Sequence, residues 1–301
     1  MKMYFKKGSE NVGNSNLNAA KATKDDEFYT CYDDIEKELF HYRKHFKNKI
    51  VFCNCDNSEK SNFWKYFYNN FEDLKLKKLI STYYKKDKIS YMTEYDGHNI
   101  TKMNLNGNGD FRNEECIKIL QSTDIIVTNP PFSLFRDYIE QMIAHDKQFL
   151  IIGNINAMKY KTIFPYFMKN KIWFGYNSVK KFTQPNGDIK KFGNVCWYTN
   201  LDIDKRHEKI ELVETYLGNE DKYPKYDNYN AIEVGRVKDI PKDYDGIMGV
   251  PISFLNKYSP EQFEIVGEFN HGSDGEFDLA KPIIKGKELF PRIAIKNIKN
   301  P

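Results

Sequence analysis

Short apolar segments alternate with amphipathic helical segments along the first half of the chain, and this alternation restricts the fold more than any other feature. The predicted strands are residues 49–53, 79–84, 124–128 and 148–153. One helix is predicted to begin near Asp33, and three more are predicted over residues 59–71, 114–120 and 133–143. Such alternation in units of about 30 residues is typical of a parallel sheet covered by helices on both faces. The sequence therefore predicts an α/β fold.

The remaining segments predict how the chain is divided. Residues 171–176 and 194–199 are expected to close the sheet as a hairpin, with a polar loop around Pro185-Asn186-Gly187. After Leu201, Gly and Pro recur and the helical periods become short, which indicates a smaller mixed region. We expect a flexible N-terminal arm over residues 1–25, a main domain over 26–200 and a second region over 201–301.

The composition narrows the class of protein. With 301 residues, 40% hydrophobic and 29% charged, the chain has enough apolar content for a core and no run long enough to span a bilayer. The first residues lack the apolar stretch of a signal peptide, so we expect a cytoplasmic protein that does not engage a membrane. Five scattered cysteines do not form a disulfide framework, and the pair Cys53-Asn54-Cys55 lacks the second ligand pair of a zinc site, so no metal is expected.

Positive charge is concentrated in one segment. The net charge of the whole chain is only +4, but residues 151–200 contain eight lysines and a single acidic residue, Asp188. Eleven aromatic residues are interleaved with these lysines. This pattern fits a surface that binds a polyanion, and it also fits a solvated lysine face over an aromatic core.

The tetrapeptide Asn129-Pro130-Pro131-Phe132 directly follows the predicted strand 124–128 and precedes a helix. Ligands of open α/β sheets bind at the carboxyl ends of the strands, which is where this tetrapeptide lies. The two prolines stiffen the backbone and provide no N–H donor, so an amide oxygen and a fixed carbonyl stand side by side as acceptors for an NH2 group. A ring that can stack on a planar base follows at once. The tetrapeptide is therefore a candidate clamp for the exocyclic amine of a nucleobase; the alternative is an ordinary strand-exit turn.

At this motif the chain resembles a known family. Asn129–Phe132 looks like the catalytic motif of amino-group DNA methyltransferases, and its surroundings resemble the EcoRI-type adenine-specific enzymes. The segments that carry the resemblance are Asp26-Glu27-Phe28-Tyr29-Thr30, Cys53-Asn54-Cys55-Asp56, Ser61-Asn62-Phe63, Gly109-Asp110-Phe111-Arg112, Thr128 to Arg136 and Gly249-Val250-Pro251-Ile252-Ser253-Phe254-Leu255. They extend over most of the chain.

The resemblance implies a Rossmann-like methyltransferase fold that uses S-adenosylmethionine, with target recognition in residues 201–301. It implies that Asn129 and the Pro130 carbonyl accept hydrogen bonds from the N6 amine of a flipped adenine, while Phe132 stacks on the base. It also implies two sets of cofactor contacts. The first set consists of Tyr29 and Thr30, at the methionine end of the cofactor, together with Asn54, Cys55 and Asp56 after the first strand. The second set consists of Asp110 and Phe111, at the adenine of the cofactor.

Two features depart from the usual methyltransferase pattern. No Gly-rich loop follows the first strand, a departure that the EcoRI-like group shares. No acidic residue ends the second strand, where one normally holds the ribose hydroxyls; Asp87 and Glu94 are the nearest substitutes.

The resemblance also gives the basic segment a role. Lys180, Lys181, Lys190 and Lys191 bracket the polar loop and are predicted to contact DNA phosphates. The expected partner is double-stranded DNA, and the resemblance allows for a cognate restriction endonuclease acting on the same site. Two alternatives stay open: a methyltransferase for another planar amine (cytosine N4, an RNA adenine or a protein glutamine), and a nucleic-acid binding protein on a decayed methyltransferase scaffold.

Overall fold

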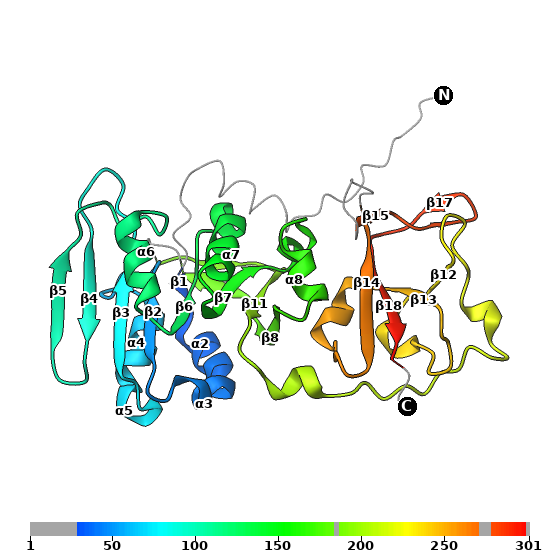
Figure 1. Cartoon of the computed structure of the whole chain (residues 1–301), viewed down its shortest axis with the longest axis horizontal. Helices are drawn as coiled ribbons and strands as arrows, with labels where there is room; N and C mark the ends of the chain where they lie inside the picture. The colour runs from blue at the N-terminus through cyan, green and yellow to red at the C-terminus, as the bar shows by residue number, and fades with distance from the viewer. Residues whose placement is uncertain (1–28, 184–186, 271–277, 299–301) are drawn as a thin grey trace.

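The computed structural model describes residues 29–183, 187–270 and 278–298, and its main element is an eight-stranded sheet (Figure 1). From one edge to the other, the strands are β5 (Ile100–Asn104), β4 (Tyr91–Tyr95), β3 (Lys78–Thr82), β2 (Ile50–Cys53), β6 (Ile125–Thr128), β7 (Gln148–Asn154), β11 (Val195–Thr199) and β8 (Trp173–Ser178). The central strands β3, β2, β6 and β7 are mutually parallel. The strands outside them pair antiparallel.

The predicted parallel sheet is therefore confirmed for the four central strands, and antiparallel strands extend it at both edges. The β4–β5 hairpin has no counterpart among the predicted elements, because every residue of β5 is exposed and the segment lacks an alternating apolar pattern. Its one local signal is Asp96-Gly97 at the turn, where Gly97 has φ +94°. Such a dipeptide is a frequent hairpin turn.

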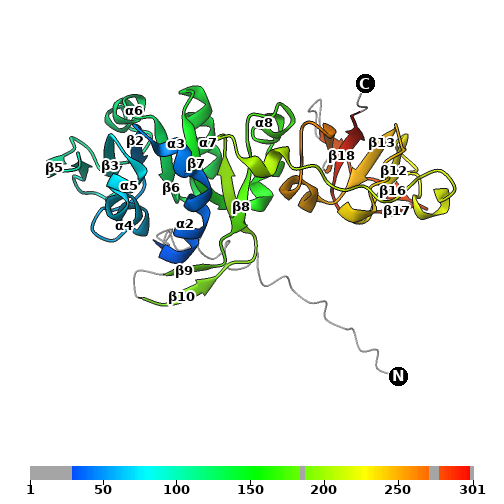
Figure 2. The same cartoon turned by 90° about the horizontal axis from the view of Figure 1, so that it is seen from below.

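Alternating side chains of the central strands form the two faces of the sheet. In β2, Phe52 belongs to one buried cluster, whereas Val51 and Cys53 belong to the other. Helices α6 (Glu114–Gln121) and α7 (Phe135–Ala144) cover the face of Phe52. The opposite face is covered by α2 (Tyr32–Leu39), α3 (Arg43–Phe46), α4 (Asn62–Asn69) and α5 (Phe71–Leu74), as Figure 2 shows. The expected cover of helices on both faces is present.

The helices lie where the sequence predicts them, with shifted boundaries. The helix predicted from Asp33 is divided into α2, a 3-10 turn η1 (Phe40–Tyr42) and α3. The helix predicted over 59–71 begins only at Asn62, because the Ser61 hydroxyl caps it by accepting the backbone N–H groups of Phe63 and Trp64. The helix predicted over 133–143 begins with the 3-10 turn η2 (Phe132–Leu134), which α7 follows.

A small three-stranded sheet lies beside the main one. It contains β1 (Tyr29–Thr30), β9 (Lys181–Thr183) and β10 (Ile189–Lys191), all antiparallel. The predicted pairing of the segments 171–176 and 194–199 is confirmed by the ladder between β8 and β11. Their connection contains the strands β9 and β10, and of the predicted polar loop around Pro185-Asn186-Gly187 only Gly187 lies within the described residues.

A second large sheet is built from the last third of the chain. Its strands are, in order, β12 (Ala231–Glu233), β13 (Ile247–Val250), β18 (Arg292–Asn297), β14 (Phe263–Asn270) and β15 (Asp278–Ala280), with a hairpin of β16 (Ile283–Ile284) and β17 (Lys287–Glu288) beside them. The remaining short helices are η3 (Ile155–Lys159), α8 (Phe164–Met168), η4 (Asp204–His207), η5 (Glu220–Lys222), η6 (Val237–Asp239) and η7 (Ile252–Asn256).

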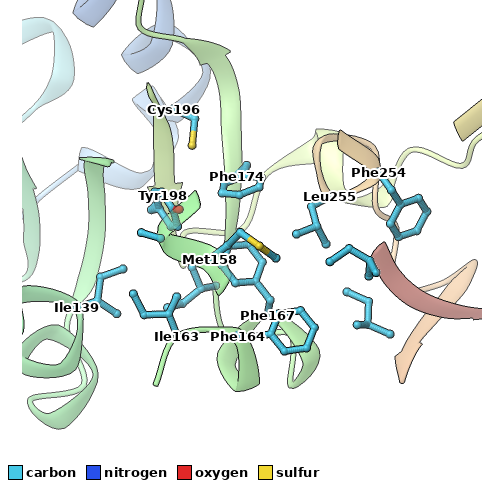
Figure 3. Close-up of a cluster of buried hydrophobic side chains, with 14 of the residues drawn as sticks. Ile139, Met158, Ile163, Phe164, Phe167, Phe174, Cys196, Tyr198, Phe254 and Leu255 are labelled. Atoms are coloured by element: carbon cyan, nitrogen blue, oxygen red, sulfur yellow. The ribbon is translucent and has the colours of Figure 1, made fainter. Parts of the chain in front are cut away.

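The two sheets share one hydrophobic core. Phe254 and Leu255 of η7 belong to the same buried cluster as Phe164 and Phe167 of α8 (Figure 3). The division into domains at residues 26–200 and 201–301 stays a prediction. The predicted arm, residues 1–25, lies outside the described residues.

Candidate active site

The candidate site lies where the direction of strand crossover reverses in the main sheet. After β2 the chain crosses to β3 on one side, and it later returns to β6 on the other side of β2. The carboxyl ends of β2 and β6 therefore lie side by side without a helix connecting them. Such a switch point is the usual ligand site of open α/β sheets. Asn54, Cys55 and Asp56 follow β2, and Asn129 follows β6.

The motif Asn129–Phe132 leaves β6 as a rigid turn. Pro130 is buried, and the Pro131 carbonyl accepts the backbone N–H of Leu134 at 3.0 Å as η2 begins. The half-buried ring of Phe132 lies edge-on to Phe182, with the centroids 6.1 Å apart, and 6.4 Å from the centroid of Phe192. The motif is thus held between the main sheet and the small sheet.

Asp56 joins β6 to the loop after β2. Its buried carboxylate accepts the Ser61 hydroxyl at 2.6 Å, and it accepts the Thr128 hydroxyl. It also accepts the backbone N–H of Asn129. Burial raises the pKa of Asp56 to about 6, although these three hydrogen bonds favour the charged form. The predicted role of Asp56 in cofactor binding stays a prediction.

Asn54 and Phe111 are connected through α7. The side-chain oxygen of Asn54 accepts the hydroxyl of Tyr138, which is fully buried on α7. The ring of Tyr138 lies edge-on to the ring of Phe111, with the centroids 5.0 Å apart. Asn54 is itself buried, and its carbonyl accepts the Thr82 hydroxyl at 3.2 Å. Cys55, between Asn54 and Asp56, is partly exposed, and burial raises the pKa of its thiol well above the usual range.

Asp110 lies on a tightly built loop. Arg112 donates two guanidinium hydrogen bonds to its carboxylate, at 3.0 and 2.7 Å, and these bonds hold the pKa of Asp110 below its usual value. The preceding Gly109 has φ +78°, and a Cβ there would lie 2.1 Å from the carbonyl oxygen of Tyr83. The loop after β3 and the loop before α6 therefore touch at a point where only glycine fits.

Tyr29 and Thr30 form β1 of the small sheet. The carbonyl of Thr30 accepts the side-chain amide of Asn62, the first residue of α4, at 2.8 Å. In the ladder with β9, Thr30 pairs with Phe182, the residue whose ring contacts Phe132. The predicted methionine-end element thus lies beside the predicted catalytic motif.

The four predicted DNA-binding lysines lie on or beside the β9–β10 hairpin. Lys181 on β9 pairs directly with Lys191 on β10, and Lys190 pairs with Phe182. Lys180, Lys181 and Lys191 are exposed, and Lys190 is half-buried with its Nζ 5.8 Å from the centroid of Phe192. Phe182 and Phe192 connect this lysine hairpin, residues 180–183 and 187–192, to Phe132.

The structure thus brings the sequence-predicted residues of the catalytic motif, the 54–56 segment, the 110–111 segment, β1 and the lysine hairpin to one end of the sheet. Their individual roles stay predictions. Thr128 and Tyr138 connect these segments; sequence reasoning assigned no role to Thr128 and missed Tyr138. The position of Thr128, as the last residue of the strand before the motif, was the one sequence signal for it; Tyr138 carries none.

The suggested ribose-binding substitutes are placed differently from each other. Glu94 lies on β4 with its carboxylate 2.7 Å from Lys78 Nζ, whereas Asp87 is exposed in the turn after β3. In the described ranges 29–183, 187–270 and 278–298, no group of three or more His, Cys, Asp or Glu side chains is arranged to hold a metal ion. Nor does this part of the chain contain a helix that is long and apolar enough to cross a membrane.

A cavity of about 390 Å³ lies away from this site, in the last third of the chain. Glu214, Lys222, Arg236 and Asp239 are among its lining residues. They pair with one another, Arg236 with Asp239 at 2.6 Å and Lys222 with Glu214 at 3.4 Å. The charges of the cavity are thus largely balanced within its own wall.

Known proteins that are similar to this chain include three that are named Type II methyltransferases. The chain is 46% identical to the Type II methyltransferase M.EcoRI of Escherichia coli, over 96% of this chain and 98% of that protein. It is 42% identical to M.MgeORF184P of Mycoplasma genitalium, over 83% of this chain and 85% of the relative, and 40% identical to M.MpnI of Mycoplasma pneumoniae, over 94% and 98%. No solved structure matches it. The family model described as adenine-specific methyltransferase EcoRI matches residues 16–297, and the chain therefore belongs to this family of adenine-specific methyltransferases.

Proposed function

We propose that the protein transfers a methyl group from S-adenosylmethionine to the N6 amine of an adenine at a specific site in double-stranded DNA. The observation that carries the proposal is the position of Asn129–Phe132, at the carboxyl end of β6 and at the switch point of the sheet, in a chain of the adenine-specific methyltransferase EcoRI family. The relatives are named Type II methyltransferases. Both facts favour an active adenine methyltransferase over a decayed binding protein or an enzyme for another amine.

The parallel strands β3, β2, β6 and β7, with helices on both faces, support a Rossmann-like methyltransferase sheet. The residues at its switch point fit S-adenosylmethionine. Asp110 keeps a low pKa, so it is ionised at neutral pH. A carboxylate has about four acceptor positions, so Asp110 can bind Arg112 and still accept the adenine amine of the cofactor. Phe111, which is 4% exposed, would form part of the apolar wall beside Asp110.

The other end of the cofactor site is assigned to β1 and the loop after β2. Tyr29 and Thr30 would hold the methionine part, and Asn54, Cys55 and Asp56 would border the centre. Asn62 fixes the carbonyl of Thr30, and Tyr138 fixes the side chain of Asn54. When bound, S-adenosylmethionine supplies an electrophilic methyl group.

The catalytic motif acts on the target amine. The lone pair of an aromatic amine is delocalised into the ring, which makes the nitrogen a poor nucleophile. The Asn129 side-chain oxygen and the Pro130 carbonyl would accept its two hydrogens and favour a pyramidal nitrogen with a directed lone pair. Proline fixes this carbonyl, so the acceptors are in place before the base arrives. After methyl transfer the nitrogen is positively charged, so it loses its proton readily and no strong general base is required.

The ring of Phe132 would stack on the target base. An adenine inside a duplex cannot reach Asn129, so the base has to be flipped out. The half-buried ring of Phe132 is fixed by Phe182 and Phe192 and offers a surface for the flipped base.

The lysine hairpin would bind phosphates near the flipped base. Its exposed lysines extend from the small sheet whose aromatic residues contact Phe132. We assign the catalytic role to residues 26–200 and target recognition to residues 201–301. A restriction endonuclease with the same recognition site is the protein partner that a modification enzyme of this kind would have.

The experiment that tests the proposed function is nucleoside mass spectrometry of DNA incubated with the protein and S-adenosylmethionine. We expect N6-methyladenine from the wild type and none from Asn129→Ala. Calorimetry should show that Asn129→Ala binds S-adenosylmethionine as the wild type does. Asn99→Ala, at the exposed β4–β5 turn, is the matched control and should methylate normally. N4-methylcytosine instead of N6-methyladenine, or full activity of Asn129→Ala, would refute the proposal.

A further inference from the structure

The backbone of the catalytic motif has a single hydrogen-bond donor between β6 and η2. Pro130 and Pro131 have no N–H group, so the N–H of Asn129 is the last donor before Phe132. This N–H donates to the carboxylate of Asp56. The direction in which the chain leaves β6 therefore depends on an acceptor from the loop after β2.

The Asp56 carboxylate is held from several sides. The hydroxyl of Thr128, the residue before Asn129, donates to its Oδ2, and the hydroxyl of Ser61 donates to its Oδ1 at 2.6 Å. The backbone N–H of Asp56 donates to the Thr82 carbonyl at 3.0 Å. The side chain is 8% exposed. Its position is therefore fixed by β3, by β6 and by the start of α4.

The contact with α4 adds charge to this geometry. The Ser61 hydroxyl that donates to Asp56 accepts the N–H of Phe63 at 3.0 Å and that of Trp64 at 3.5 Å, as the N-cap of the helix. The N-terminus of a helix has a partial positive charge, which favours a carboxylate nearby. The serine hydroxyl thus connects the helix terminus to Asp56, and Asp56 connects to Asn129.

We propose that Asp56 is a positioning residue that orients Asn129 for methyl transfer through the Asn129 N–H and the Thr128 hydroxyl. This assignment rests on the proposed function of Asn129. It goes beyond the predicted cofactor role because the two carboxylate oxygens are engaged by groups of the chain that lead to the catalytic motif. A carboxylate is needed here because it accepts several short hydrogen bonds at once, which an amide or a hydroxyl does less well.

The test compares Asp56→Ala and Asp56→Asn with the wild type in kcat and in S-adenosylmethionine affinity. Asp56→Ala should lower kcat roughly 100-fold, the order of loss when a reacting group is displaced by about 1 Å. Its affinity for S-adenosylmethionine should stay close to that of the wild type. Asp56→Asn keeps one acceptor oxygen and should recover part of kcat. If Asp56→Ala is unfolded by circular dichroism, Asp56→Asn alone decides by the same two measurements.

A double variant separates this inference from the proposed function. If Asp56 acts through Asn129 and does not hold the cofactor, the double variant Asp56→Ala/Asn129→Ala should bind S-adenosylmethionine as tightly as Asn129→Ala alone. A loss of cofactor affinity in Asp56→Asn with kcat retained would overturn the positioning role and support direct cofactor binding. Full activity of Asn129→Ala would instead refute the proposed function itself.

The pH profile gives a readout that a purely structural residue would not move. With the pKa of Asp56 at about 6, kcat of the wild type should fall as the pH drops below that value, because the protonated carboxyl is a weaker acceptor. The titratable groups that face this carboxyl are Cys53 and Cys55, whose pKa values are raised well above the usual range, so neither titrates there. The pKa of Tyr138 on α7 is likewise raised well above its usual value. Asp56→Asn should lack the acidic limb; an unchanged limb contradicts the assignment.

Discussion

The ring of Phe132 lies nearly perpendicular to the ring of Phe182, with an interplanar angle of 86° and the centroids 6.1 Å apart. One ring belongs to the proposed catalytic motif Asn129–Phe132 and the other to β9 of the lysine hairpin. Phe182 is fully buried and also lies edge-on to Phe192, at 5.3 Å. The ring proposed to stack on the target base and the strand proposed to bind phosphates therefore form one packed unit.

From this connection we expect the hairpin lysines to supply DNA affinity without taking part in the chemistry. Replacing Lys181 and Lys191 by Gln should weaken DNA binding equally for specific and unspecific sequences. The slope of log K against log salt should fall by about 0.9 for each phosphate that the variant no longer neutralises. Fluorescence anisotropy at several salt concentrations measures this slope, and kcat at saturating DNA should stay unchanged.

The control for the lysine variants is Lys47→Gln. Lys47 is exposed just after α3, at the end of the sheet where β2 begins, and this end is opposite to the candidate site. It should leave the salt slope unchanged. A salt slope that is the same in the hairpin variants and the wild type would remove the hairpin from the DNA interface.

Gly109 allows a second prediction, which concerns cofactor binding. A Cβ at Gly109 would lie 2.1 Å from the Tyr83 carbonyl oxygen, so Gly109→Ala has to displace the loop that carries Asp110 and Phe111. We expect a weaker S-adenosylmethionine affinity, measured by calorimetry. Gly218→Ala is the matched control: Gly218 has a similar φ of +79° but nothing within 4 Å of the added atom. Gly218→Ala should lose only about 1–2 kcal/mol of stability, the strain of a left-handed residue, and should bind the cofactor with normal affinity.

The central part of the fold could be predicted because burial leaves a pattern in the sequence. β6 is buried on every residue, so its apolar run marks a central strand, and the motif after it marks the site. β5 is exposed on every residue and β9 is only three residues long, so neither produces such a pattern. β5 pairs with the adjacent strand β4 in a hairpin, whereas β9 pairs with the distant segment Tyr29–Thr30, which the local sequence does not specify.

The same limit applies to the candidate site. The types of residue at Asn129–Phe132 indicate their chemistry directly, because few other functions need two adjacent acceptors and a ring. The contact of Asp56 with Thr128 joins residues that are 72 positions apart. This contact exists because β2 and β6 are neighbours in the sheet, and the sequence alone does not specify that strand order.

Glu38 gives a prediction about stability. This buried carboxylate on α2 accepts the backbone N–H groups of Tyr176 and Asn177, both at 2.8 Å, and the Tyr42 hydroxyl at 2.9 Å. Glu38→Ala leaves the buried Tyr42 hydroxyl and two half-buried backbone N–H groups without their acceptor, at a cost of up to about 1–3 kcal/mol for each. Urea unfolding should show a large loss of stability, and Glu38→Gln, which keeps one acceptor, a smaller one. The control Glu36→Ala, exposed on the same helix, should change the free energy of unfolding by less than about 0.5 kcal/mol.

Asp56 should also make stability depend on pH in a defined direction. Burial raises its pKa from 3.8 to about 6, so between these values the native chain keeps a proton that the unfolded chain has released. The free energy of unfolding therefore gains from this group as the pH falls through 6 towards 3.8. Asp56→Asn cannot titrate, so the difference in unfolding free energy, wild type minus Asp56→Asn, should increase over this interval. Urea unfolding of both proteins at a series of pH values measures the difference. A constant difference, or one that shrinks as the pH falls, would mean that the pKa of the buried carboxyl is not raised.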